Sequence, residues 1–176
     1  VWDGRTSAGW AAEMEAADAV VHLAGDPVAE GRWSANKKAA IRDSRVEGTR
    51  AVVDAIRSAQ RKPRVLVSAS AVGFYGNVPE GEVPESSAQG SDFLAGVCAA
   101  WEAEALKAEA TGVRTVVLRI GVVIDKNGGA LSKIALPFKF FAGGHLGTGR
   151  QWLPWIHRDD VVGLIRHCVD HASLRG

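Results

Sequence analysis

The stretch Ala19-Val20-Val21-His22-Leu23-Ala24, closed by Gly25, decides the fold class of this chain. It is a short apolar run rich in β-branched residues, and a Gly-Asp-Pro turn follows it. This pattern is typical of a strand that is buried on both faces of a parallel sheet. Two further runs of the same kind, at residues 65–70 and 115–120, predict two more strands.

Segments with helical periodicity separate these strands. Ser34 is expected to cap a helix that ends near Gln60, with a buried stripe of Ile41, Val52, Val53 and Ile56. Further helices are expected over 91–110, with Gly112 as the stop, over 131–141, and from 158–160 onward, where Asp159 and Asp160 suit an N-cap. The alternation predicts an α/β fold with a Rossmann-like, doubly wound parallel sheet and helices on both faces.

The composition narrows the function classes. The chain has 176 residues, of which 47% are hydrophobic and 23% charged, and its net charge is +1. Its scattered basic residues argue against nucleic acid as a partner, and no apolar run is long enough to span a membrane. Two cysteines, Cys98 and Cys168, are expected to be buried thiols in a reducing compartment, which favours the cytoplasm.

Small residues follow each predicted strand. Ligands of open α/β sheets bind beyond the carboxyl ends of the strands, and residues without bulky side chains let a flat ligand approach the backbone. The segments concerned are Ala24-Gly25, Ser68-Ala69-Ser70 and Gly121-Val122. The same residues are equally compatible with tight turns that bind nothing.

Four strings in order resemble the extended short-chain dehydrogenase/reductases of the NAD-dependent epimerase/dehydratase type. They are residues 21–25 (VHLAG), 68–76 (SASAVGFYG), 118–121 (LRIG) and 155–160 (WIHRDD). Three more strings, Asp43-Ser44-Arg45-Val46, residues 98–102 (CAAWE) and residues 147–155 (GTGRQWLPW), resemble one epimerase-like branch of that family. The resemblance covers nearly the whole chain.

The resemblance implies an NAD(P) cofactor, with NAD and NADP both open, and a small-molecule substrate similar to a nucleotide sugar. It assigns Ser70 to polarising a substrate oxygen and makes His157 a candidate base. The cofactor-binding residues that it implies are Leu23, Ala24, Gly25, Ser68, Ala69, Cys98, Ile120, Gly121 and Val122. The substrate-binding residues are Tyr75, Arg150, Gln151 and Trp152, in part of a small subdomain over about 126–157 within a single domain spanning 1–176.

Two departures from the family pattern bear on catalysis. No Gly-x-Gly-x-x-Gly opens a helix, which fits a fold that is truncated at both ends. The catalytic Tyr-x-x-x-Lys pair is replaced by Leu94 and Cys98, which removes the usual general base and the cation that lowers its pKa.

Two functions therefore remain open: an NAD(P)-dependent oxidoreductase or epimerase, and a non-catalytic dinucleotide-binding sensor or interaction protein. A closed pocket where Ser70, His157 and Arg150 converge would favour the enzyme. A homodimer is possible. No metal site is expected, because His167 and His171 have helical spacing but no evident third ligand.

Overall fold

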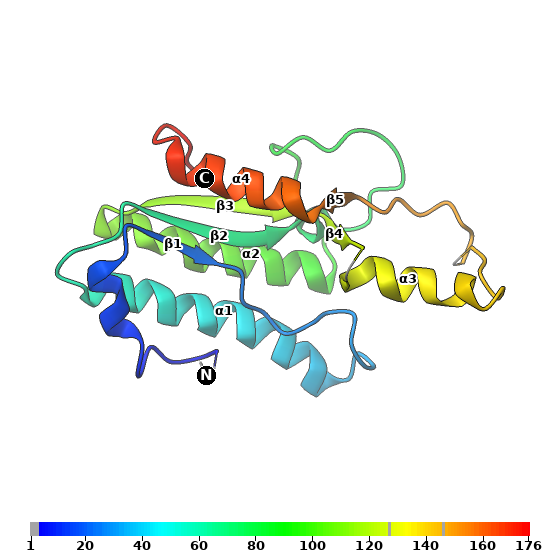
Figure 1. Ribbon diagram of the computed structural model, residues 1–176, viewed down its shortest axis with the longest axis horizontal. Helices are drawn as coiled ribbons and strands as arrows, with labels where there is room; N and C mark the ends of the chain where they lie inside the picture. Colours follow the sequence, from blue (N-terminus) through cyan, green and yellow to red (C-terminus); the bar gives the residue numbers. More distant parts are fainter. Residues whose placement is uncertain (1–3, 127, 146) are drawn as a thin grey trace.

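The computed structural model describes residues 4–126, 128–145 and 147–176. Its main sheet has three parallel strands in the order β1-β2-β3, namely β1 (Ala19–His22), β2 (Val65–Ala71) and β3 (Arg114–Ile120). α1 (Ala35–Ser58) and α2 (Phe93–Leu106) connect consecutive strands and lie on one face, whereas α4 (Arg158–Asp170) lies on the other (Figure 1). The predicted α/β fold, with helices on both faces of a parallel sheet, is confirmed.

The apolar residues of the core form one cluster on each face of the sheet. On the α1 face, the predicted stripe is buried, with Ile41 and Ile56 fully inaccessible, and its members Val52, Val53 and Ile56 pack in one cluster with Leu66 of β2. On the opposite face, Val65 and Val67 pack with Cys168 and its neighbours on α4. The alternation of side chains along β2 therefore supplies both clusters, which is why this central strand is buried almost throughout.

β1 differs from the prediction. It ends at His22 instead of Ala24, and it is not buried on both faces, because Val21 is 43% exposed. β1 is an edge strand of the described sheet, and α4 packs over β2 and β3 on the face to which Val21 belongs. An apolar sequence alone does not reveal that a strand lies at an edge.

The helix ends follow local chemistry with one exception. Ser34 caps α1 by accepting a hydrogen bond from Lys37 N at 3.2 Å, as predicted, and Asp92 caps α2 in the same way. The segment predicted as one helix over 91–110 is α2 followed by a 3₁₀ helix, Lys107–Thr111, that stops at left-handed Gly112. At α4 the predicted cap is wrong: His157 is the N-cap, and the two aspartates lie in the first turn.

A second, two-stranded parallel sheet was not predicted. β4 (Val122–Asp125) pairs with β5 (Trp155–His157), and α3 (Gly129–Lys139) lies between them in sequence. This part extends past the end of the main sheet (Figure 1). It covers most of the predicted subdomain over 126–157, in which positions 127 and 146 lie outside the described residues. The division into subdomains stays a prediction.

The expectation that both cysteines are buried thiols is confirmed. Cys98 and Cys168 are both free and buried. The rings of His167 and His171 stack at 3.8 Å near the end of α4, and no group of three metal-ligating side chains occurs within the described ranges. None of the described helices combines the length and the apolar character needed to cross a bilayer.

Gly121 allows the two sheets to meet. A Cβ at this position would lie 2.8 Å from the Pro154 carbonyl oxygen, which accepts a hydrogen bond from Val122 N. We expect Gly121→Ala to lower the free energy of unfolding by about 1–3 kcal/mol, because backbone on both sides must shift. Urea unfolding of the full-length protein measures this change.

Gly96→Ala is the matched control, since nothing lies within 4 Å of a Cβ at this helical position. It should leave stability unchanged or raise it by up to about 1 kcal/mol. Equal stability of the Gly121→Ala variant and the unsubstituted protein would contradict this close approach.

Candidate cofactor site at the strand ends

The carboxyl ends of β1, β2 and β3 meet at one edge of the sheet (Figure 1). The parallel register places His22 beside Ser68 and Ala71 beside Ile120. The segments that follow, 23–25, 72–73 and 121–122, therefore emerge on the same side. Two of them contain the small residues that were predicted to receive a ligand, Ala24-Gly25 and Gly121-Val122, whereas the third predicted segment, Ser68-Ala69-Ser70, lies inside β2.

At the end of β1, the loop is fixed to α1. Asp26 N donates a hydrogen bond to Ser44 Oγ at 2.9 Å, and the Asp26 carboxylate forms an ion pair with Lys37. The Arg45 guanidinium lies against Gly25, where a Cβ would be 3.0 Å from Cζ. Of the predicted cofactor residues here, Leu23 is 52% exposed and Gly25 is also exposed, so both are accessible.

At the end of β2, Ser70 belongs to a buried polar network. Its hydroxyl donates to Glu102 Oε1 at 2.6 Å, and only 3% of Ser70 is exposed. Both oxygens of Glu102 accept hydrogen bonds of 2.9 Å from Arg119, through Nε and Nη2. These bonds raise the pKa of Arg119, and the same Glu102 side chain orients the Ser70 hydroxyl.

Arg119 connects this network to the segment after β2. Nη1 donates to Tyr75 Oη at 2.8 Å and to the Glu85 carbonyl at 3.0 Å. The guanidinium also lies 3.6 Å from the centre of the Phe74 ring. Tyr75, predicted to bind substrate, is thus held half-buried with its phenol oxygen toward the β3 side of the site.

Leu94 and Cys98 of α2 face the turn that follows Ser70 and the end of β2. A Cβ on Gly73 would lie 3.7 Å from Leu94 Cβ and 3.8 Å from Cys98 Sγ, so both side chains face the turn after β2. Burial raises the pKa of the Cys98 thiol, which lies close enough to interact with the Ser70 hydroxyl and the Ala71 backbone. A protonated thiol and an alkyl group supply neither a general base nor a cation.

His157 lies at the junction of β5 and α4. Its Nδ1 accepts a hydrogen bond from Asp159 N at 3.2 Å and so caps α4, which requires that the ring proton is on Nε2. The side chain is 45% exposed. Its role as a catalytic base stays a prediction.

The predicted substrate residues of the 147–155 string lie on an exposed segment. Trp152 is 74% exposed, and its indole nitrogen donates to the Pro79 carbonyl at 3.0 Å, which connects this segment to the loop after β2. Arg150 and Gln151 are also exposed. Arg150, His157 and Ser70 line neither of the two surface hollows described below.

The remaining predicted cofactor residues differ in accessibility. Ser68 is fully buried, its hydroxyl donates to the Ala69 carbonyl at 3.3 Å, and Ala69 itself is 7% exposed. Ala24, Ile120, Gly121 and Val122 are half-buried at the strand ends. Direct contact with a ligand is therefore easier for the residues that follow the strands than for those inside β2.

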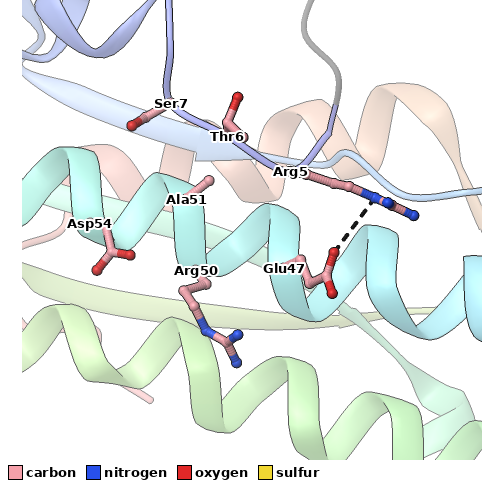
Figure 2. A pocket seen from close by; sticks show the side chains of 7 residues that line it. All are labelled: Arg5, Thr6, Ser7, Glu47, Arg50, Ala51 and Asp54. Atoms are coloured by element: carbon pink, nitrogen blue, oxygen red, sulfur yellow. Dashed lines mark ion pairs between the residues drawn. The ribbon is translucent and has the colours of Figure 1, made fainter.

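Two surface hollows of the described residues involve the N-terminal segment, α1 and β1. One, of about 370 Å³, lies where the N-terminal segment passes over α1, and Figure 2 shows Arg5 reaching Glu47 there, at 3.5 Å. The other, of about 380 Å³, follows the free edge of β1 between Trp10 and Val52 and extends to Leu23 and Ala24. Only the second touches the predicted cofactor residues.

Sequence reasoning missed Glu102, Arg119 and Arg45 as site residues, although the strings that contain them were noted. A recognisable signal existed for the first two. Each is a charged residue inside a mostly apolar element, their charges are opposite, and Glu102 precedes Arg119 by 17 residues. Charged side chains in such positions are rarely buried unless they are paired.

The sequence matches a known protein family over nearly its whole length. The model of the "NAD dependent epimerase/dehydratase family" matches residues 5–175. The chain belongs to this family.

Relatives of this epimerase-family chain agree with the assignment. A chloroplastic epimerase family protein of Arabidopsis thaliana, an SDR39U1 homolog, is 47% identical over 169 residues, which are 95% of this chain and 48% of the relative. The crystal structure of human epimerase family protein SDR39U1 (isoform 2) with NADPH superimposes with a TM-score of 0.84 at 32% identity, over 94% of this chain and 59% of that one. The crystal structure of a nucleoside-diphosphate sugar epimerase from Corynebacterium glutamicum superimposes with a TM-score of 0.82 at 33% identity. The match covers 100% of this chain and 36% of that one.

This epimerase-family chain spans about half the length of the curated relatives that it matches. The Rossmann-like fold class and the resemblance to the SDR39U1-like branch are confirmed by these matches. The strand ends fit the dinucleotide that the family name implies. Gly25 has no side chain to obstruct a ligand, and Nε and Nη2 of Arg45 beside it donate no hydrogen bond within the described residues.

Proposed function

We propose that this protein binds a nicotinamide dinucleotide across the carboxyl ends of β1, β2 and β3 and acts as an oxidoreductase or epimerase. The observation that carries the proposal is the convergence of three strand ends with small, accessible residues at one edge. The NADPH in the human relative supports it, because that protein is 32% identical over nearly all of this chain. We favour NADP(H) over NAD(H) for the same reason.

The substrate that we propose is a small molecule of the nucleoside diphosphate sugar class. The printed name of the Corynebacterium relative, at 33% identity, supports this class. The nicotinamide would supply hydride transfer. Ser70 would orient a substrate oxygen once its proton turns away from Glu102, His157 would exchange a proton, and Arg150, Gln151, Trp152 and Tyr75 would hold the substrate.

A second function has its own supporting observation. Leu94 and Cys98 lie beside the turn after β2, where neither can transfer a proton as a tyrosine supported by a lysine would. This arrangement favours a protein that binds the dinucleotide without turning over a substrate. Its partners would then be other proteins; we propose no nucleic acid or membrane partner for either function, and the cytoplasm as the location.

Titration of the full-length protein with NADPH and with NADH tests the proposal. Energy transfer from tryptophan to the reduced nicotinamide reports binding directly, and we expect saturation with tighter binding of NADPH. Addition of a UDP-sugar to the saturated complex, followed by the absorbance of the reduced nicotinamide and by product analysis, separates the two functions. Absence of binding to either nucleotide at millimolar concentration would contradict both proposed functions.

A further inference from the structure

The loop that follows β2 is closed at its base and exposed beyond it. Gly76 and Gly90 meet at the base so closely that a Cβ on Gly90 would lie 2.7 Å from the Gly76 nitrogen. Gly90 N also donates a hydrogen bond to the Phe74 carbonyl at 2.9 Å. Residues 77–89, between the two glycines, are mostly exposed. A surface loop whose ends meet in this way is an Ω-loop, and such loops frequently have a functional role.

Two hydrogen bonds connect this Ω-loop to other parts of the fold. Arg119 Nη1, near the carboxyl end of β3, donates to the Glu85 carbonyl at 3.0 Å. The Trp152 indole nitrogen donates to the Pro79 carbonyl at 3.0 Å. Trp152 lies two residues before Pro154, whose carbonyl accepts a hydrogen bond from the first residue of β4. The Ω-loop and the segment before β5 therefore form a continuous bridge from the end of β2 to the end of β3.

The two sides of this bridge carry opposite charges. Residues 77–89 contain three glutamates and no lysine or arginine, whereas residues 126–157 contain four lysines and arginines and no acidic residue. All of these charged side chains are exposed: Glu80, Glu82, Glu85, Lys126, Lys133, Lys139 and Arg150. The three glutamates form no ion pair within the described residues. Their attraction to the basic part therefore acts over a distance, and salt should weaken it.

We propose that residues 77–89 are a flap that opens and closes over the carboxyl ends of β2 and β3, with the Trp152–Pro79 hydrogen bond as its latch. The latch is easily broken, because it is a single bond between neutral groups and Trp152 is 74% exposed even in the closed position. The base at Gly76 and Gly90 stays in place when the tip moves. The flap belongs to the fold itself, so the inference holds whichever ligand binds at the strand ends.

Cleavage of the full-length protein by a glutamate-specific protease tests the flap, because Glu80 and Glu82 lie next to the latch. A loop must detach from the surface before a protease can bind it, so the cleavage rate follows the population of the open form. Trp152→Phe keeps an aromatic ring and removes the N–H donor. It should raise the rate of cleavage after these two glutamates about three- to tenfold. Trp155→Phe is the matched control and should leave the rate unchanged, since Trp155 is 62% exposed and its indole forms no hydrogen bond within the described residues.

Salt provides a second measurement that needs no substitution. Raising NaCl from about 0.05 M to about 0.5 M should speed cleavage of the unsubstituted protein, relative to a free peptide of residues 77–89 under the same conditions. Equal rates for Trp152→Phe and the unsubstituted protein would overturn the inference. Cleavage of the unsubstituted protein as fast as that of the free peptide would overturn it too. If Trp152→Phe does not fold, a rate that is independent of salt overturns it. No nucleotide is present in these measurements, so a failure of the proposed function would leave their outcome unchanged.

Discussion

Arg119→Met is expected to lower the free energy of unfolding by about 3 kcal/mol or more, because it leaves the Glu102 carboxylate buried without its cation. Glu102 is 8% exposed, and Arg119 donates to both of its oxygens at 2.9 Å. The methionine retains much of the side-chain volume, so the change measures the lost ion pair more than lost packing. Urea unfolding of the full-length protein gives the value.

Arg50→Met is the matched control for this prediction. Arg50 also pairs with a buried carboxylate, Glu104, but Arg50 is 53% exposed and Glu104 keeps a second partner, Lys107, at 2.9 Å. Its loss should cost clearly less, about 1 kcal/mol. The double variant Glu102→Gln/Arg119→Met should regain part of the stability, and equal stability of Arg119→Met and Arg50→Met would contradict the importance of the buried pair.

Arg119 also links stability to the candidate site. The same guanidinium donates to Tyr75 Oη and lies against Phe74, and its partner Glu102 accepts a hydrogen bond from the Ser70 hydroxyl. We infer that the pair positions the turn after β2 for whatever ligand binds there.

His22 should make the stability of the protein depend on pH, with a loss of roughly 3 kcal/mol between pH 7 and pH 4. Burial lowers the pKa of this histidine from 6.5 to about 4, and its Nε2 is 3.0 Å from Thr49 Oγ1. As the pH falls below 6.5, His22 becomes protonated in the unfolded chain but stays neutral in the folded chain until about pH 4. Stability is therefore fully present above pH 6.5, decreases as the pH falls, and stops decreasing below about 4, where the folded state is protonated too.

The difference between the unsubstituted protein and His22→Gln isolates this effect from the titration of carboxylates. We expect the difference in unfolding free energy to change with pH between 4 and 6.5 and to be constant above it. His145→Gln is the control, because His145 is exposed. A His22→Gln variant whose unfolding free energy parallels that of the unsubstituted protein over this range would show that His22 is not buried in its neutral form.

The sequence by itself determined the fold class, the order of the main elements and the family. β-branched runs predict the strands of the main sheet, Ser34 marks the start of α1, and Gly112 marks the stop after α2. Propensities, caps and periodicity act over a few residues, so these features can be recognised before any tertiary contact is known. The strings that identify the family are also local.

Only the tertiary structure decided which residues meet at the strand ends. The pairing of β4 with β5 depends on the approach of Pro154 to Gly121, and strands of three or four residues are too short to show a period. The exposure of Val21 depends on which strand lies at the edge and where α4 packs. The partners of Glu102, Ser70 and Arg119, lie on other elements, and burial and pairing are properties of that three-dimensional arrangement, which no local pattern encodes.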